Sequence, residues 1–171
     1  MNHFDKPQMS PEPMTTNPHT ETKVPLTVAE IMTTNLVTVG LRESLAHAIA
    51  LLSIHRFHHL LVTDPIGKLV GVLSDRDLLG AVARITNWQT CEISQIMTAN
   101  PVTVRPECPL SVAVSMMLSK RFNSLPVLDE KGMVTGILTS TDLLRSYESK
   151  VESLQMRLQQ IGLVEFSLAD R

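Results

Sequence analysis

The sequence predicts a mixed α/β fold of the α+β type, made of two β-α-β-β-α repeats followed by a C-terminal helix. The main observation is an internal duplication at a constant offset of 65 residues, in which 20 of the 55 residues aligned from Val28 to Val82 are identical. In addition, each copy alternates short β-branched stretches with segments of helical apolar spacing. Repeats of this length usually need each other to close a core, so we expect both copies to fold together.

The elements follow the same order in both copies. Residues 1–25 hold five prolines among polar residues and predict a flexible tail. The first repeat spans 26–85 and the second 91–147. Each begins with a short extended stretch, LVTV at 36–39 or PVTV at 101–104, and continues with a helix whose apolar residues start at Leu45 or Leu110.

Two strands and a second helix complete each repeat. The strands are joined by turn sequences at 64–67 and 129–132, both of which end in glycine. The second helix begins near residue 75 in the first copy and near residue 140 in the second. Only the second copy continues as a helical extension, which we assign to residues 148–171.

From Leu144 into the extension, apolar residues fall at alternating spacings of three and four. They are Leu144, Tyr147, Val151, Leu154, Leu158 and Ile161, and Gly162 follows as the expected helix stop. The spacing fits a short coiled-coil seam. It fits equally well a helix that lies on its own domain.

Composition narrows the function classes. A net charge of −2 provides no general field for nucleic acid or anionic membranes. No apolar run approaches the ~18 residues of a membrane span, and the N-terminus lacks the apolar core of a secretory signal. Cys91 and Cys108 have no metal or redox spacing and do not suggest a disulfide scaffold, which favours a reducing compartment. We therefore expect a cytoplasmic protein that binds neither nucleic acid nor membrane.

The repeated motif G-x-x-[ST]-x-x-D is the strongest functional signal. It comprises Gly71, Ser74 and Asp77 in the first copy, and Gly136, Thr139 and Asp142 in the second. A glycine within a strand allows a ligand or another stretch of backbone to approach closely. The hydroxyl and the acidic residue three positions later also match a helix capping box, which by itself contributes about 1 kcal/mol.

The same residues suit a nucleotide. Free N–H groups at a helix N-terminus, together with a hydroxyl, favour a phosphate. A nearby carboxylate suits the two hydroxyls of a ribose, as acidic residues do in dinucleotide sites. Helix capping and nucleotide binding both remain open on the motif alone.

The tandem pattern IMTxN[LP]VTV…G[VI]L[ST]xxDLL resembles a pair of CBS domains, together called a Bateman module, over residues 26–147. The resemblance implies two repeats packed sheet to sheet with pseudo-twofold symmetry. It further implies clefts that bind AMP, ADP, ATP or S-adenosylmethionine, a homodimer, and regulation of an unknown partner protein rather than catalysis.

Family positions map onto two clefts. The Asp77 cleft has Ser74, Arg76, Asp77, His58 and His59, with Met97 and Phe122 expected against the adenine. The Asp142 cleft has Thr139, Thr141, Asp142, Asn123 and Ser124, with Met32 and Phe57 in the adenine role. The resemblance also implies that backbone groups around residues 27–29 and 92–94 form hydrogen bonds with the adenine.

The two clefts differ in charge. Arg76 and two imidazoles lead us to expect that the Asp77 cleft prefers ADP or ATP and loses affinity as pH rises through the histidine range. The Asp142 cleft, with neutral donors, should prefer AMP or a ligand without phosphate.

A metal enzyme and a ligand-free scaffold are the two other functions. A metal enzyme using His55 and His59 lacks a third ligand at suitable spacing, and no nucleophile motif is present. A ligand-free dimerisation scaffold, whose aspartates are only helix caps, is the main alternative. We expect no catalytic residues, no metal and no cofactor beyond a regulatory ligand.

Overall fold

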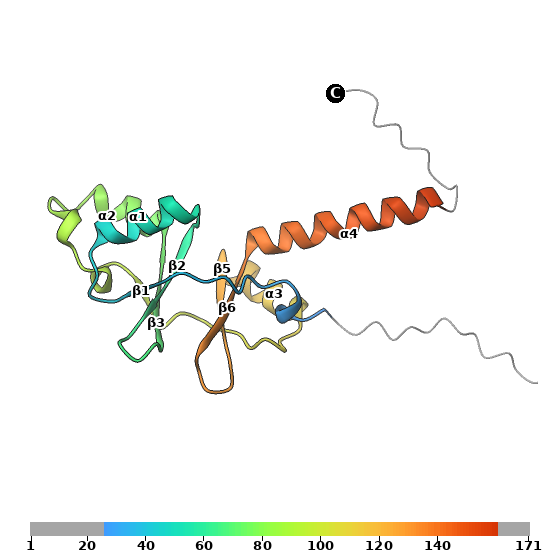
Figure 1. Cartoon of the computed structure of the whole chain (residues 1–171), viewed down its shortest axis with the longest axis horizontal. Coiled ribbons are helices and arrows are strands. Elements are labelled where there is room, and N and C mark those ends of the chain that lie inside the picture. Colours follow the sequence, from blue (N-terminus) through green and yellow to red (C-terminus); the bar gives the residue numbers. More distant parts are fainter. Residues whose placement is uncertain (1–25, 161–171) are drawn as a thin grey trace, which may run out of the picture.

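The computed structural model describes residues 26–160. The Pro-rich segment 1–25 and residues 161–171, with the predicted seam residue Ile161 and stop residue Gly162, lie outside that range. Two α/β units stand side by side, and one long helix leaves the second unit (Figure 1). The predicted mixed fold with a C-terminal helix is confirmed.

The first unit has the predicted order of elements. Strand β1 (Thr38–Gly40) precedes helix α1 (Leu45–His55), strands β2 (His59–Thr63) and β3 (Leu69–Ser74), and helix α2 (Asp75–Val82). The second unit has helix α3 (Leu110–Lys120), strands β5 (Ser124–Leu128) and β6 (Val134–Thr139), and helix α4 (Ser140–Gln160), while the extended stretch predicted at 101–104 forms only an isolated bridge at Val104. The short strand β4 (Thr98–Ala99) of the second repeat joins the sheet of the first unit, in the order β1-β2-β3-β4. Three 3-10 turns complete the chain: η1 (Val28–Glu30), η2 (Trp88–Thr90) and η3 (Ile93–Gln95).

Local sequence explains the predicted turns. Asp64 accepts hydrogen bonds from the backbone N–H groups of Ile66 and Lys68, and Gly67 adopts a φ of +83° that only glycine takes without strain. Asp129 and Gly132 repeat this arrangement, with a φ of +79° at the glycine. Both β-hairpins therefore have the same register.

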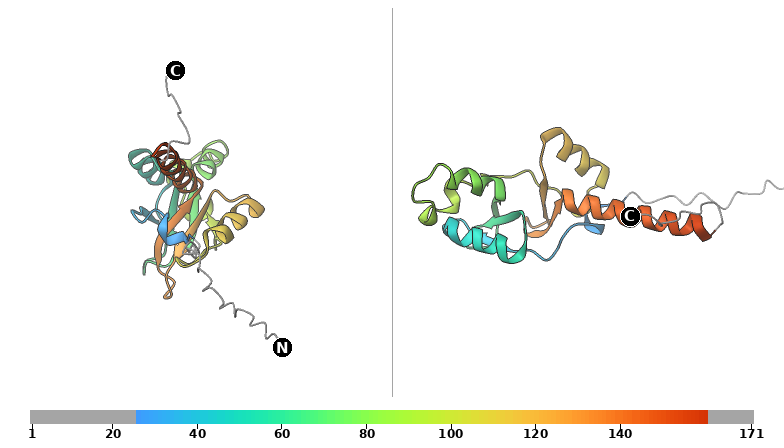
Figure 2. Two further views of the ribbon diagram at one scale, coloured as in Figure 1. Left: turned by 90° about the vertical axis from the view of Figure 1, so that its right-hand side faces the viewer. Right: turned by 90° about the horizontal axis from the view of Figure 1, so that it is seen from above.

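The core lies in three layers. Leu60, Val62 and Leu73 face helices α1 and α2, whereas Leu61 and Val72 between them face the other unit, as strand alternation requires. Ile137 of β6 joins Leu61 and Val72 in an apolar cluster between the two sheets. The helices α1 and α2 cover one outer side and α3 the other, so the sheets meet in the middle (Figures 1 and 2).

The segment that begins each repeat in sequence packs on the other repeat in space. Val28 is fully buried in the core of the second unit, and its N–H donates to the carbonyl of Cys108. Ile93 is fully buried in the core of the first unit, and its N–H donates to the carbonyl of Glu43. Strand β4 correspondingly pairs with β3 of the first unit. The two units thus exchange their leading segments.

The strand glycines allow this exchange. A Cβ on Gly71 would lie 2.5 Å from the sulfur of Met97, and a Cβ on Gly136 would lie 2.5 Å from the sulfur of Met32. The close approach predicted at these glycines is therefore made by a methionine of the exchanged segment.

Helix α4 projects beyond the second unit instead of lying on it (Figures 1 and 2). Leu144 is 69% exposed and Tyr147 is 70% exposed, although both belong to the apolar seam. The sequence left two interpretations open for this helix. The structure does not show residues 144–160 packed on their own domain.

Candidate functional site

A cavity of about 860 Å³ lies between the two units. Its walls are symmetric, because every lining residue except His55 and Arg145 has its 65-residue counterpart in the wall as well. Both G-x-x-[ST]-x-x-D motifs contribute to the same cavity through their hydroxyl and carboxylate residues. The two motifs come together because the sheets that end in them pack on each other through Leu61, Val72 and Ile137. Within each hairpin, His59 lies opposite Ser74 and Ser124 lies opposite Thr139.

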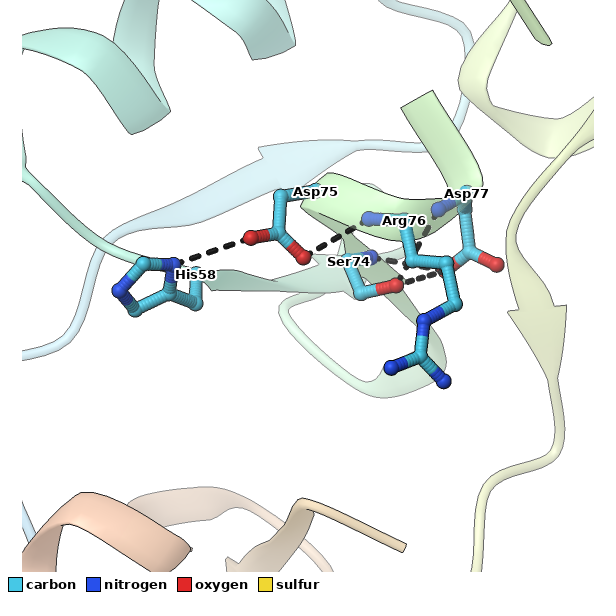
Figure 3. Close-up of polar contacts among 5 residues, drawn as sticks. All are labelled: His58, Ser74, Asp75, Arg76 and Asp77. Carbon is cyan, nitrogen blue, oxygen red and sulfur yellow. Dashed lines mark hydrogen bonds and ion pairs between the residues drawn. The ribbon is translucent and has the colours of Figure 1, made fainter. Parts of the chain in front are cut away.

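The first motif forms a capping box at the start of α2. Ser74 is the N-cap, its Oγ accepts from the N–H of Asp77 at 3.3 Å, and Asp77 Oδ2 accepts from the N–H of Ser74 at 2.8 Å. The Ser74 hydroxyl donates to that same oxygen at 2.6 Å (Figure 3). The predicted helix cap is confirmed, and it uses only one carboxylate oxygen.

The other oxygen of Asp77 remains available. Asp77 Oδ1 has no hydrogen-bond partner within residues 26–160. Every fully buried side-chain oxygen in that range does have a partner, so Asp77 Oδ1 must be accessible to solvent. The Arg76 guanidinium points away from the neighbouring side chains (Figure 3). A carboxylate oxygen and a cation thus stand at the start of α2 on the cavity wall.

The second motif has the same cap but a different second oxygen. Asp142 Oδ2 accepts from the N–H of Thr139 at 2.8 Å and from its hydroxyl at 2.6 Å. Asp142 Oδ1 accepts from the Thr33 hydroxyl at 2.8 Å. Asp142 is only 7% exposed and is the one buried charged residue in the described part of the chain.

His58 pairs with Asp75 at the mouth of the first motif. The His58 Nδ1 to Asp75 Oδ2 distance is 3.0 Å, and both side chains are more than half exposed (Figure 3). Burial alone would raise the pKa of Asp75, but hydrogen bonds from His58 and from the backbone N–H of Arg76 outweigh it and hold that pKa below its usual value.

His59 is the more deeply placed imidazole. Burial lowers the pKa of His59 below the usual 6.5, because the cationic ring would lose its hydration. The nearby Asp75 carboxylate opposes this effect but does not outweigh it. The neutral form therefore dominates near pH 7 in the absence of an anion.

The structure brings most predicted residues into the cavity wall. Those lining it are Phe57, His58, His59, Ser74, Arg76, Asp77, Phe122, Asn123, Ser124, Thr139, Thr141 and Asp142. Met32 and Met97 are not among the lining residues and instead pack against Gly136 and Gly71.

Sequence reasoning missed several residues of this wall, and four of them bear on ligand binding. Arg56 and Arg121 end helices α1 and α3 with φ of 55° and 56°, and both line the cavity. Arg145 in the first turns of α4 lines it too, so the expectation that only neutral donors accompany Asp142 is wrong on this point. Thr33 was also missed. The duplicated arginines were a usable signal, since both follow the helix at matching positions.

Within residues 26–160 no group of three or more His, Cys, Asp or Glu side chains is arranged to hold a metal ion. No helix in that same range has the length and apolar content needed to cross a membrane.

Comparison with protein families identifies the chain. The CBS domain model matches residues 28–84 and 93–149, so this protein belongs to the CBS domain family and carries two copies of the domain. A CBS domain-containing protein of Dictyostelium discoideum is 34% identical over 127 residues, covering 68% of this chain and 88% of the relative. The L-aspartate semialdehyde sulfurtransferase of Methanocaldococcus jannaschii is 33% identical over 129 residues, which cover 75% of this chain but only 25% of that enzyme.

Solved structures agree with the fold and include ligand complexes. The CBS domain pair of protein MJ0100, in complex with 5′-methylthioadenosine and S-adenosyl-L-methionine, matches with a TM-score of 0.68 at 29% identity, covering 74% of this chain and 99% of that one. CBSX2 of Arabidopsis thaliana, solved in complex with AMP, matches with a TM-score of 0.65 at 33% identity, covering 77% of this chain and 98% of that one.

Proposed function

We propose that this protein is a regulatory module, not an enzyme, that binds an adenosine ligand between its two CBS domains and signals its occupancy to a partner protein. The single observation that carries this is the shared cavity, whose wall holds both helix starts, both motif carboxylates and Arg76. Helix N–H groups and Arg76 suit phosphates, and an accessible carboxylate oxygen suits ribose hydroxyls. The AMP and S-adenosylmethionine complexes of similar CBS pairs support the same ligand class.

We further propose that the Asp77 side prefers ADP or ATP. The Arg76 guanidinium makes no hydrogen bond or ion pair within residues 26–160, and His59 lies across the hairpin from Ser74, so both can respond to phosphate charge. Arg145 reduces the contrast with the Asp142 side without providing an imidazole. A reducing, cytoplasmic location stays part of the proposal, supported by two cysteines that carry free thiols.

Thermal unfolding of the purified protein with AMP, ADP, ATP or S-adenosylmethionine tests the proposal. A ligand at ~100 times its dissociation constant should add about 2.7 kcal/mol to the free energy of unfolding and raise the midpoint of thermal unfolding by about 5 to 11 °C. Arg76→Ala should weaken ATP binding by about 10- to 100-fold, because one charge-assisted hydrogen bond is lost, and should barely change S-adenosylmethionine binding. Arg42→Ala is the control, since Arg42 is exposed and outside the cavity. ATP affinity unchanged in Arg76→Ala would refute the role of Arg76.

The pH dependence should follow His59. Burial holds the pKa of His59 below its usual value in the free protein, and a phosphate bound beside the ring would raise that pKa by favouring the cation. Binding then takes up a proton, so affinity falls as pH rises above the lowered pKa of the free protein. One histidine limits the slope to at most about tenfold in dissociation constant per pH unit.

The stability of the unliganded protein should change with pH in the opposite direction to ligand affinity. The pKa of His59 is lower in the folded protein than in the unfolded chain, so its contribution to stability is present above pH 6.5 and is lost as pH falls below 6.5. Titration calorimetry and thermal melts from pH 5.5 to 8 measure both trends. His59→Gln should flatten them, and identical slopes in wild type and variant would contradict the assignment.

A homodimer is proposed on a separate observation. Exposed apolar residues occupy matching positions of the two second helices, Leu79 and Val82 on α2 and Leu144 and Tyr147 on α4, and Leu154 continues the seam. Such a row is typical of a contact with a second copy. The same row favours the alternative function, a ligand-free dimerisation scaffold.

Light scattering after size exclusion tests the seam. Leu154→Glu is expected to raise the dimer dissociation constant by roughly tenfold or more, because a charge would enter an apolar contact. Ser149→Glu adds the same charge to an exposed position off the seam and should leave the dimer intact. Equal effects of both variants, or a monomeric wild type, would rule out the seam.

A further inference from the structure

The two halves of the cavity differ at one hydrogen bond. Thr33 and Thr98 occupy matching positions, and their backbones pair in the same way with Ile137 and Val72. The Thr33 hydroxyl donates to Asp142 Oδ1 at 2.8 Å, whereas no hydrogen bond joins Thr98 to Asp77 among the described residues. The difference therefore lies in the side chains and not in the pairing of the strands.

This bond changes what each carboxylate can accept. In both motifs Oδ2 is already engaged by the helix cap, so the second oxygen decides whether a ribose can bind. Asp77 Oδ1 is accessible and without a protein donor, while Asp142 Oδ1 already accepts from Thr33 and its residue is only 7% exposed. A ribose at Asp142 would have to share Oδ1 with the Thr33 hydroxyl on a buried carboxylate, whereas at Asp77 it meets an accessible oxygen that no protein group uses.

We propose that Thr33 occludes the Asp142 half of the cavity, so that one adenosine ligand binds per chain, with its ribose on Asp77. This inference rests on the proposed function and specifies its stoichiometry. Thr33 acts as a specificity-determining residue, because the repeated sequence alone would provide two equivalent carboxylates. The bond also ties the exchanged segment that contains Thr33 to the start of α4.

Calorimetric titration of the full chain with AMP tests the proposal, because AMP suits both halves by charge. Wild type should bind one AMP per chain, and Asp77→Asn should weaken it at least tenfold by replacing an acceptor oxygen and removing its charge. Thr33→Val keeps the shape but removes the donor, and should raise the stoichiometry to two. Adding Asp142→Asn to Thr33→Val should return it to one.

The control and the opposing outcomes are distinct. Thr34→Val makes the same change at an exposed neighbour outside the cavity and should keep one site. Two sites in wild type, or loss of the only site in Asp142→Asn and not in Asp77→Asn, would overturn the role of Thr33 while leaving the adenosine function standing. A stoichiometry of one in Thr33→Val would also overturn it. Wild type that binds no adenosine ligand at all would instead remove the proposed function and this inference together.

Discussion

Ile93→Ala should destabilise the protein by about 2–5 kcal/mol, and the damage should appear in the first unit although Ile93 belongs to the second repeat by sequence. Ile93 is fully buried in the cluster that contains Leu45, Leu60 and Leu73. Removing its side chain leaves a cavity beneath α1 and β2, because the surrounding side chains can only partly relax.

Native-state hydrogen exchange locates the damage. Faster exchange is expected first in α1 and β2, with β5 and β6 less affected, because local openings follow the loss of nearby buried contacts. Val28→Ala is the reciprocal variant, since Val28 is fully buried against Leu125 and Leu138 of the second unit. It should speed exchange mainly in β5 and α3. If Ile93→Ala opened the second unit first, the exchange of leading segments would be refuted.

Local features of the fold were predictable because short stretches determine them. The turn at Asp64 and Gly67 needs an acceptor side chain and a positive φ, and both requirements are visible in the sequence. The cap at Ser74 and Asp77 follows in the same way from residues three apart. The layered core also follows, since alternation in β2 and β3 places every second residue on one face.

The exchange of leading segments had no comparable signal. Val28 and Ile93 are counterparts in the duplication, and an apolar residue at that position fits either core equally well. The duplication shows that the positions are equivalent, but not to which unit each side chain packs. The methionines illustrate the consequence, because Met32 and Met97 were expected against adenine and in fact fill the space above the strand glycines. Whether either also reaches a ligand stays a prediction.

The candidate site was predictable in its residues but not in its asymmetry. The duplication places Thr33 and Thr98 at matching positions after the same Ile-Met pair, so the repeat alone does not predict that only one hydroxyl binds an aspartate. The backbones of the two threonines pair alike, so the difference lies in their side chains, which the repeat pattern does not specify. Helix capping and ribose binding also proved compatible, since the cap engages only one oxygen of Asp77.

Asp142→Ala should cost about 2–4 kcal/mol of unfolding free energy, well above the ~1 kcal/mol of a simple helix cap. The change removes the acceptor for the Thr33 hydroxyl and for the N–H and hydroxyl of Thr139. These donors are then left without a protein partner, which costs more than the loss of a cap alone.

Asp77→Ala is the matched control for Asp142→Ala. It removes an equivalent cap, but its second oxygen serves no protein donor, so about 1 kcal/mol is expected. Urea unfolding of both variants measures the difference, and Asp142→Asn, which keeps one acceptor oxygen, should fall between them. Equal costs for the two alanine variants would mean that the Thr33 bond adds nothing. The expected inequality means that loss of ligand binding is cleanly interpreted in Asp77 variants, whereas the same loss in Asp142→Ala would mix binding with folding.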